Sequence, residues 1–160
     1  MTKVKKGIYP GTFDPITKGH INIIQRSFKF FDKLIIAVAD NNKKSPLFNV
    51  NERVEMIKEI FKDNGKIQVL SFNGLLVDFA KRQNVKVIIR GLRAVSDFEY
   101  ELQIALTNRQ LCKDFESLFL MPSIEYIYLS SSVVKEIASK NGKLDKFVTS
   151  NVKSKLQNKY

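Results

Sequence analysis

Apolar and polar stretches alternate along the whole chain, and their spacing predicts a repeated order of strands and helices. Runs 33–40 and 85–91 are apolar at successive positions, as in strands that are buried on both faces of a sheet. With them, five runs have the length of strands: 5–9, 33–40, 66–72, 85–91 and 117–122, with 127–129 after the last. Apolar residues recur at helical spacing in six segments: 20–31, 51–61, 75–83, 96–111, 130–140 and, weakly, 151–160.

Strands that alternate with helices over short connections form right-handed βαβ units around a parallel sheet. The pattern therefore predicts an α/β fold, a doubly wound parallel sheet of five strands. Ser96 and Glu99 have the spacing of a capping box, which marks the start of the fourth helix. No repeat, low-complexity segment or linker interrupts the pattern, so we expect one domain over residues 1–160, with 151–160 as its C-terminal helix.

In such folds, ligands bind beyond the carboxyl ends of the strands, near the point where the strand order switches. The segments at those ends are unusually rich in turn residues and polar side chains. They are YPGTFDP after the first strand, DNNKKSP after the second, FNG after the third, RGLR after the fourth, and the residues before SSS. We therefore expect the site at this edge of the sheet.

Composition narrows the class of protein and its partners. The 27 Lys and Arg against 16 Asp and Glu give a net charge of +11, but no block of five or six basic residues occurs. This favours a lysine-rich solvated surface or a small polyanionic ligand over nucleic acid. We expect neither a membrane span nor a signal peptide. Cys112 is the single cysteine, so an internal disulfide and a Cys-rich zinc site are excluded and a cytoplasmic setting is expected.

The segment YPGTFDPITKGH, residues 9–20, carries the only histidine of the chain. A lone histidine is often a packed or surface residue. Here Gly19 lets the backbone approach a ligand closely, and the start of the following helix offers free N–H groups to an anion. The sequence contains neither GxGxxG nor GxxxxGKS, so it predicts neither the usual dinucleotide site nor a P-loop. His20 is the favoured catalytic candidate.

Several motifs together resemble a known family. GTFDPITKGH is similar to the (T/H)xGH signature of the nucleotidyltransferase superfamily, and LSSSVVK is similar to its second, serine-rich signature. The block IIRGLRAVSDFEYELQIALTNRQL between them and the block ESLFLMPSIEYIYLSSS resemble the bacterial phosphopantetheine adenylyltransferase family. The resemblance covers about the first 150 residues. It implies a Rossmann-like nucleotidyltransferase fold.

The resemblance also implies a reaction. The phosphate of 4′-phosphopantetheine attacks the α-phosphorus of ATP, with Mg²⁺ assisting, and dephospho-coenzyme A and pyrophosphate are formed, the penultimate step of coenzyme A synthesis. A homohexamer arranged as a dimer of trimers and feedback inhibition by coenzyme A are implied as well. A phosphate monoester is already a competent nucleophile, so the site needs hydrogen-bond donors and cations rather than a general base. The sequence shows no Ser-His-Asp triad.

The matched blocks imply a role for individual residues. His20 would stabilise the transition state, and the acceptor would bind at Thr12, Lys44, Leu76 and Arg90. The ATP site would comprise Thr12, Phe13, His20, Gly91, Leu92, Arg93, Glu101, Tyr126, Ile127, Tyr128, Leu129, Ser130, Ser131 and Ser132. No cluster of carboxylates identifies a protein ligand for Mg²⁺, so the metal ligands are left unassigned.

Some of these positions have a plainer interpretation. Lys44 stands beside Lys43 in a solvated loop, and its spacing from Pro46 favours it over Lys43 as the acceptor-phosphate residue. Glu101 follows acidic residues that the first turn of a helix favours in any case. Two other functions stay open at this point: another small nucleotidyltransferase, such as one acting on a mononucleotide, and a basic nucleic-acid-binding protein. Binding to many phosphates would make the latter strongly salt-dependent.

Overall fold

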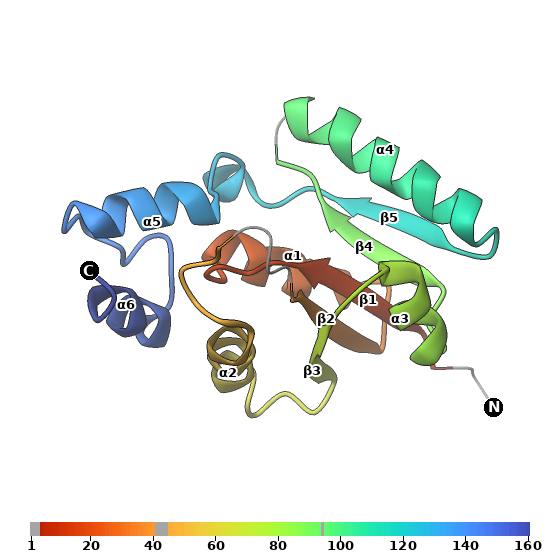
Figure 1. The fold of residues 1–160 in the computed structure, drawn as a ribbon, viewed down its shortest axis with the longest axis horizontal. Coiled ribbons are helices and arrows are strands. Elements are labelled where there is room, and N and C mark those ends of the chain that lie inside the picture. Colours follow the sequence, from red (N-terminus) through yellow and green to blue (C-terminus); the bar gives the residue numbers. More distant parts are fainter. Residues whose placement is uncertain (1–3, 41–44, 94) are drawn as a thin grey trace.

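The computed structural model describes residues 4–40, 45–93 and 95–160, with 95–97 described in their backbone alone (Figure 1). Its five strands are β1 (Lys6–Gly11), β2 (Lys33–Ala39), β3 (Ile67–Phe72), β4 (Val87–Gly91) and β5 (Glu116–Leu120). The helices are α1 (Lys18–Ser27), α2 (Val50–Ile60), α3 (Leu76–Arg82), α4 (Val95–Leu111), α5 (Ser131–Ser139) and α6 (Ser150–Gln157), with the 3-10 helix η2 (Ile124–Tyr126). The predicted alternation of strands and helices is confirmed.

All strand pairs in the sheet are parallel, and the strand order is β3-β2-β1-β4-β5. The chain moves outward from β1 through β2 to β3 and then crosses back to β4, so the order switches between β1 and β4. This confirms the doubly wound five-stranded sheet. It also places the expected ligand site where the carboxyl ends of β1 and β4 meet.

Successive strand residues point to opposite faces, and each face carries its own core. Tyr9, Ile36 and Ile89 belong to the larger core, which α1, α2, α5 and α6 cover. Ile8 and Ile88 belong to the smaller core, which is closed mainly by α3. Burial on both faces explains the continuous apolar runs in β2 and β4.

Pro10 limits how far β1 can pair with a neighbouring strand. The register of β1 against β2 runs from Lys6 to Gly11, whereas against β4 it pairs Ile8 with Ile88. Proline has no N–H to donate to a neighbouring strand. We infer that the ladder toward β4 cannot continue past this residue, and that the two strands part where the ligand site is expected.

Most predicted boundaries differ from the structure by one or two residues, and four differences are described here. Strand β1 continues through Pro10 to Gly11, where a turn was predicted. Helix α1 spans 18–27 rather than 20–31, because Thr17 caps its start and the Phe28 N–H already bonds back to Arg26 and Gln25. Helix α4 begins at Val95, one residue before the predicted cap. The C-terminal helix ends at Gln157, three residues before the predicted end.

Candidate active site

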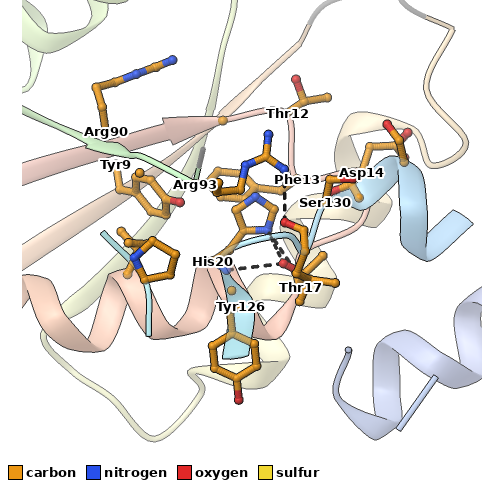
Figure 2. A pocket seen from close by; sticks show the side chains of 18 of the residues that line it. Tyr9, Thr12, Phe13, Asp14, Thr17, His20, Arg90, Arg93, Tyr126 and Ser130 are labelled. Atoms are coloured by element: carbon orange, nitrogen blue, oxygen red, sulfur yellow. Dashed lines mark hydrogen bonds between the residues drawn. The ribbon is translucent and has the colours of Figure 1, made fainter. Parts of the chain in front are cut away.

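A cavity of about 470 Å³ lies between the carboxyl ends of β1 and β4. Five segments form its wall: the end of β1 with the loop that follows it, the start of α1, Pro46 ahead of α2, the end of β4 with α4, and the segment from Pro122 into α5. Figure 2 shows His20 at its centre, with Phe13 and Arg93 beside the imidazole and the Tyr126 ring directed away from it.

The structure brings most of the predicted site residues together at this cavity. Its lining includes Thr12, Phe13, His20, Arg90, Gly91, Arg93, Glu101, Tyr126, Leu129, Ser130, Ser131 and Ser132. Leu76, Leu92, Ile127 and Tyr128 are not part of the lining; Leu76 packs against the smaller core, and Tyr128 is 86% exposed. Lys43 and Lys44 lie outside the described residues.

A capping box at the start of α1 fixes the orientation of the imidazole. The Thr17 backbone N–H donates to His20 Nδ1 at 3.0 Å, and the Thr17 hydroxyl also lies 3.0 Å from that nitrogen. The Thr17 hydroxyl in turn accepts from the His20 N–H. A backbone N–H can only donate, so Nδ1 is the unprotonated nitrogen and the neutral ring carries its proton on Nε2. His20 thus offers a hydrogen-bond donor.

Burial, with a smaller contribution from the positive charge of Arg93, lowers the pKa of His20 to about 4. The imidazole is therefore neutral throughout the physiological range. An uncharged donor suits the stabilisation of negative charge that develops on a transferred phosphoryl group. It does not suit a general base, because Nδ1 is already engaged.

The chain has a single histidine, so its imidazole can be followed without assignment. In an NMR titration we expect the ring to stay neutral from pH 8 to about pH 5.5, with a midpoint near 4 and the proton on Nε2. Because the folded pKa lies below the ordinary value, the stabilising contribution of neutral His20 is complete above about pH 6.5 and is lost as the pH falls toward 4. A midpoint near 6.5 would show that the ring is not held as described.

Phe13, in the loop between β1 and α1, is under backbone strain. Phe13 adopts a positive φ of 49° although it is a large side chain, and it is almost fully buried. Its ring packs edge-on against His20, with 5.1 Å between ring centroids. A Cβ at Gly11 would lie 2.9 Å from the Phe13 ring, so the glycine is needed there. Such conformations persist at functional sites because surrounding packing holds them.

Asp14 and Lys135 were not among the predicted site residues. The buried Asp14 carboxylate accepts from the Leu47 and Phe48 N–H groups at 3.0 and 2.9 Å and from Lys135 Nζ at 2.7 Å. Burial raises the pKa of Asp14, but Lys135 and the two N–H groups outweigh it, and the net pKa is lowered. The ion pair with Asp14 thus holds the Lys135 ammonium group at the wall of the cavity. The motif LSSSVVK already contains Lys135. No sequence signal, however, predicts that Asp14 contacts Leu47 and Phe48, which lie 33 and 34 residues later in the chain.

The serine-rich segment also holds the cavity together. Ser130 caps α5 by accepting from the Val133 N–H, and the Ser131 hydroxyl donates to the Pro15 carbonyl at 2.7 Å. On the preceding turn, Asn22 of α1 and Ser123 exchange two hydrogen bonds of 3.0 and 2.9 Å. The start of α5 therefore faces the loop after β1, where its free N–H groups can meet an anion.

Arg90 and Glu101 were predicted to bind different substrates, and the structure shows them paired with each other. Both guanidinium Nε and Nη2 donate to the Glu101 carboxylate, with 2.8 Å for Nη2 to Oε1. Both side chains are less than one-fifth exposed. Arg93 lies closer to the imidazole and donates to the Leu129 carbonyl at 3.1 Å. Two cations thus line the β4 side of the cavity.

The described residues offer no set of protein ligands for a metal ion. No group of three or more His, Cys, Asp or Glu side chains is arranged for one within 4–40, 45–93 and 95–160. The two carboxylates at the cavity, Asp14 and Glu101, are engaged by Lys135 and Arg90. The same described part of the chain contains no helix that could cross a membrane.

Comparison with known proteins agrees with this geometry. Residues 8–137 match the cytidylyltransferase-like family. The phosphopantetheine adenylyltransferases of Lawsonia intracellularis and Geobacter metallireducens are each 52% identical to this chain, over 99% and 98% of its length and 92% and 96% of theirs. That of Lachnoclostridium phytofermentans is 51% identical over 98% of this chain and 96% of its own length. The chain belongs to the phosphopantetheine adenylyltransferase family. It is an enzyme of the nucleotidyltransferase class, as the motifs predicted.

Proposed function

We propose that the chain transfers the adenylyl group of ATP reversibly to 4′-phosphopantetheine, giving dephospho-coenzyme A and pyrophosphate. The observation that carries this proposal is a neutral His20 with Nε2–H as its donor, set among Arg90, Arg93 and Lys135 in one cavity. Such a set suits two polyanions that react with each other. It contains no oriented base for a hydrolytic reaction.

Each residue has a role in the proposed transfer. An acceptor phosphate oxygen attacks the α-phosphorus, and the bond from that phosphorus to the pyrophosphate oxygen breaks. His20 Nε2–H donates to an α-phosphate oxygen as charge develops there. Arg93, Lys135 and the free N–H groups at the start of α5 offset the charge of the polyphosphate. Arg90, with Lys44 from the resemblance, offsets the charge of the acceptor phosphate.

Mg²⁺ enters this proposal with ATP. The described residues do not provide ligands for it, so we expect the ion to be held by phosphate oxygens of the nucleotide and assign it no step of its own. Inhibition by coenzyme A and the cytoplasmic setting remain predictions from the sequence. Coenzyme A contains the pantetheine arm and an adenine nucleotide, so it would compete for the same cavity.

We further propose that the enzyme is a homohexamer, a dimer of trimers, with α4 in its interfaces. This helix exposes large apolar side chains on opposite sides: Phe98, Tyr100, Leu102, Leu106 and Leu111. Large apolar side chains that gather exposed on one element mark an interaction surface. We expect Leu106→Lys to lower the molar mass by light scattering, whereas the polar neighbour change Gln103→Lys leaves it unchanged. An unchanged molar mass in both variants would show that α4 is not part of the interfaces.

The reaction is tested by pyrophosphate release from ATP and Mg²⁺ with 4′-phosphopantetheine, with nicotinamide mononucleotide, or without acceptor. The proposal predicts release with phosphopantetheine alone. Release with the mononucleotide instead would mean that the fold is assigned correctly and the acceptor wrongly. Release without acceptor would indicate hydrolysis and contradict the absence of a positioned base.

A further inference from the structure

Arg53, on the first turn of α2, is a buried cation outside the cavity. Its side chain is among the largest that are fully buried, with 1% exposed, and it is not part of the cavity lining. Within the described residues, its guanidinium donates to main-chain carbonyls alone: Nε to Phe48 at 3.0 Å and Asn49 at 3.3 Å, and Nη1 to Thr12 at 2.7 Å and Ala39 at 2.9 Å.

These four carbonyls belong to three segments that meet at the site. Thr12 lies in the loop after β1, Ala39 is the last residue of β2, and Phe48 and Asn49 lead into α2. The loop after β2 includes Lys44, the predicted acceptor residue, which lies outside the described residues. One guanidinium therefore sets the distance between the loop that faces the nucleotide and the strand end from which the acceptor loop begins.

The bond to Thr12 also fixes the orientation of a peptide group in the cavity wall. In a trans peptide the N–H points opposite to the carbonyl. Holding the Thr12 carbonyl toward Arg53 therefore directs the Phe13 N–H away from Arg53, and both Thr12 and Phe13 line the cavity. The positive φ of Phe13 is the kind of strained conformation that a rotation of this peptide would relax.

Stability alone is a poor explanation for this arrangement. Burying a charge is costly, and among the described residues this guanidinium has main-chain carbonyls rather than a carboxylate as its hydrogen-bond partners. Burial lowers the pKa of Arg53, and the charges of Asp14 and Asp40 act in the opposite direction. The fork of the guanidinium, however, places donors on separate nitrogens and so reaches carbonyls on separate segments at once. An apolar side chain has no donor, and a lysine carries its three donors on a single nitrogen.

We propose that Arg53 is a positioning residue for adenylyl transfer, which acts through the Thr12–Phe13 peptide and the end of β2. This inference rests on the proposed function. It predicts that Arg53 sets the rate of the chemical step by holding reacting groups in place, without touching either substrate. A misplacement of about 1 Å can lower a rate about 10²-fold.

The test compares Arg53→Lys and Arg53→Met with Leu156→Ala, all far below their melting temperatures. Leu156 is fully buried in α6 and lies outside the cavity lining. Its truncation therefore lowers the stability of the fold without removing a contact to the site. We expect kcat to fall about tenfold in Arg53→Lys and about 30- to 100-fold in Arg53→Met. The KM for ATP should change less than threefold in both, and Leu156→Ala should keep kcat within about twofold.

A second measurement separates this inference from the proposed reaction. If the wild-type protein fails to use phosphopantetheine, the proposed function is wrong, and the role of Arg53 is then judged from the Phe13 amide signal by NMR. In the wild type, ATP should shift that signal; in Arg53→Lys the shift should be lost while that of Ser131 remains. The proposal is overturned if the Arg53 variants keep kcat and the amide shift, if Leu156→Ala loses as much activity, or if neither Arg53 variant folds.

Discussion

Replacing His20 with alanine is expected to lower kcat by about 10²–10³-fold, the usual cost of one donor that is aimed at developing charge. Binding of ATP should change little, because the cations and the start of α5 remain. The loss follows from geometry: Nδ1 accepts from Thr17, and the neutral ring keeps its proton on Nε2 for the ligand. Single-turnover and steady-state kinetics with direct ATP titration measure the two effects.

The matched control is His20→Gln. His20 stands at the third position of α1, where glutamine completes an ordinary capping box with the N-cap threonine. The glutamine variant therefore keeps the cap and regains an N–H donor, whereas alanine loses both. We expect it to retain more activity than His20→Ala at similar stability. If His20→Ala kept kcat within about threefold of the wild type, the assigned role would be wrong.

Removing Arg90 is expected to have the second-largest effect, because two consequences add. Arg90→Met leaves the Glu101 carboxylate partly buried without its bidentate partner, which should lower the free energy of unfolding by about 2–3 kcal/mol. It also removes the charge-assisted contact that we propose between Arg90 and the acceptor phosphate. We expect that loss to raise the KM for phosphopantetheine about 10- to 100-fold, with a much smaller change for ATP.

The double variant Arg90→Met with Glu101→Gln separates these consequences. It removes both charges, so most of the lost stability should return in denaturant unfolding, while the KM for the acceptor stays high. Recovery of the acceptor KM together with stability would mean that Arg90 serves the fold alone. Equal losses for both substrates would also count against its assignment to the acceptor.

The fold followed from local information. Runs such as 33–40 and 85–91 form strands that are buried on both faces of the sheet, and such strands require apolar residues at successive positions. The start of α1 was missed by two residues because His20 completes its capping box in the position where glutamate or glutamine is the usual signal. Pro10 was predicted to end β1, but the pairing of β1 with β2 continues through it to Gly11, whereas the pairing with β4 joins Ile8 to Ile88.

The site was predictable where a motif carries its own geometry. Thr17 to His20 and Ser130 to Ser132 lie at helix starts, so their neighbours in sequence also hold them in space. The sequence did not predict the roles of Asp14 and Arg53, because both side chains bind main-chain groups of distant segments. No pattern of side chains along the sequence reveals such contacts. The pairing of Arg90 with Glu101 was hidden for a different reason, because it depends on how α4 lies against β4.

The central claim is that the acceptor phosphate attacks ATP directly while His20 acts only as a donor. The measurement that tests it most directly is the configuration at the α-phosphorus after transfer from a single diastereomer of ATP with sulfur on that phosphorus. One in-line displacement predicts inversion. Retention would require two displacements through an adenylylated side chain, and it would contradict both the direct transfer and the role given to His20.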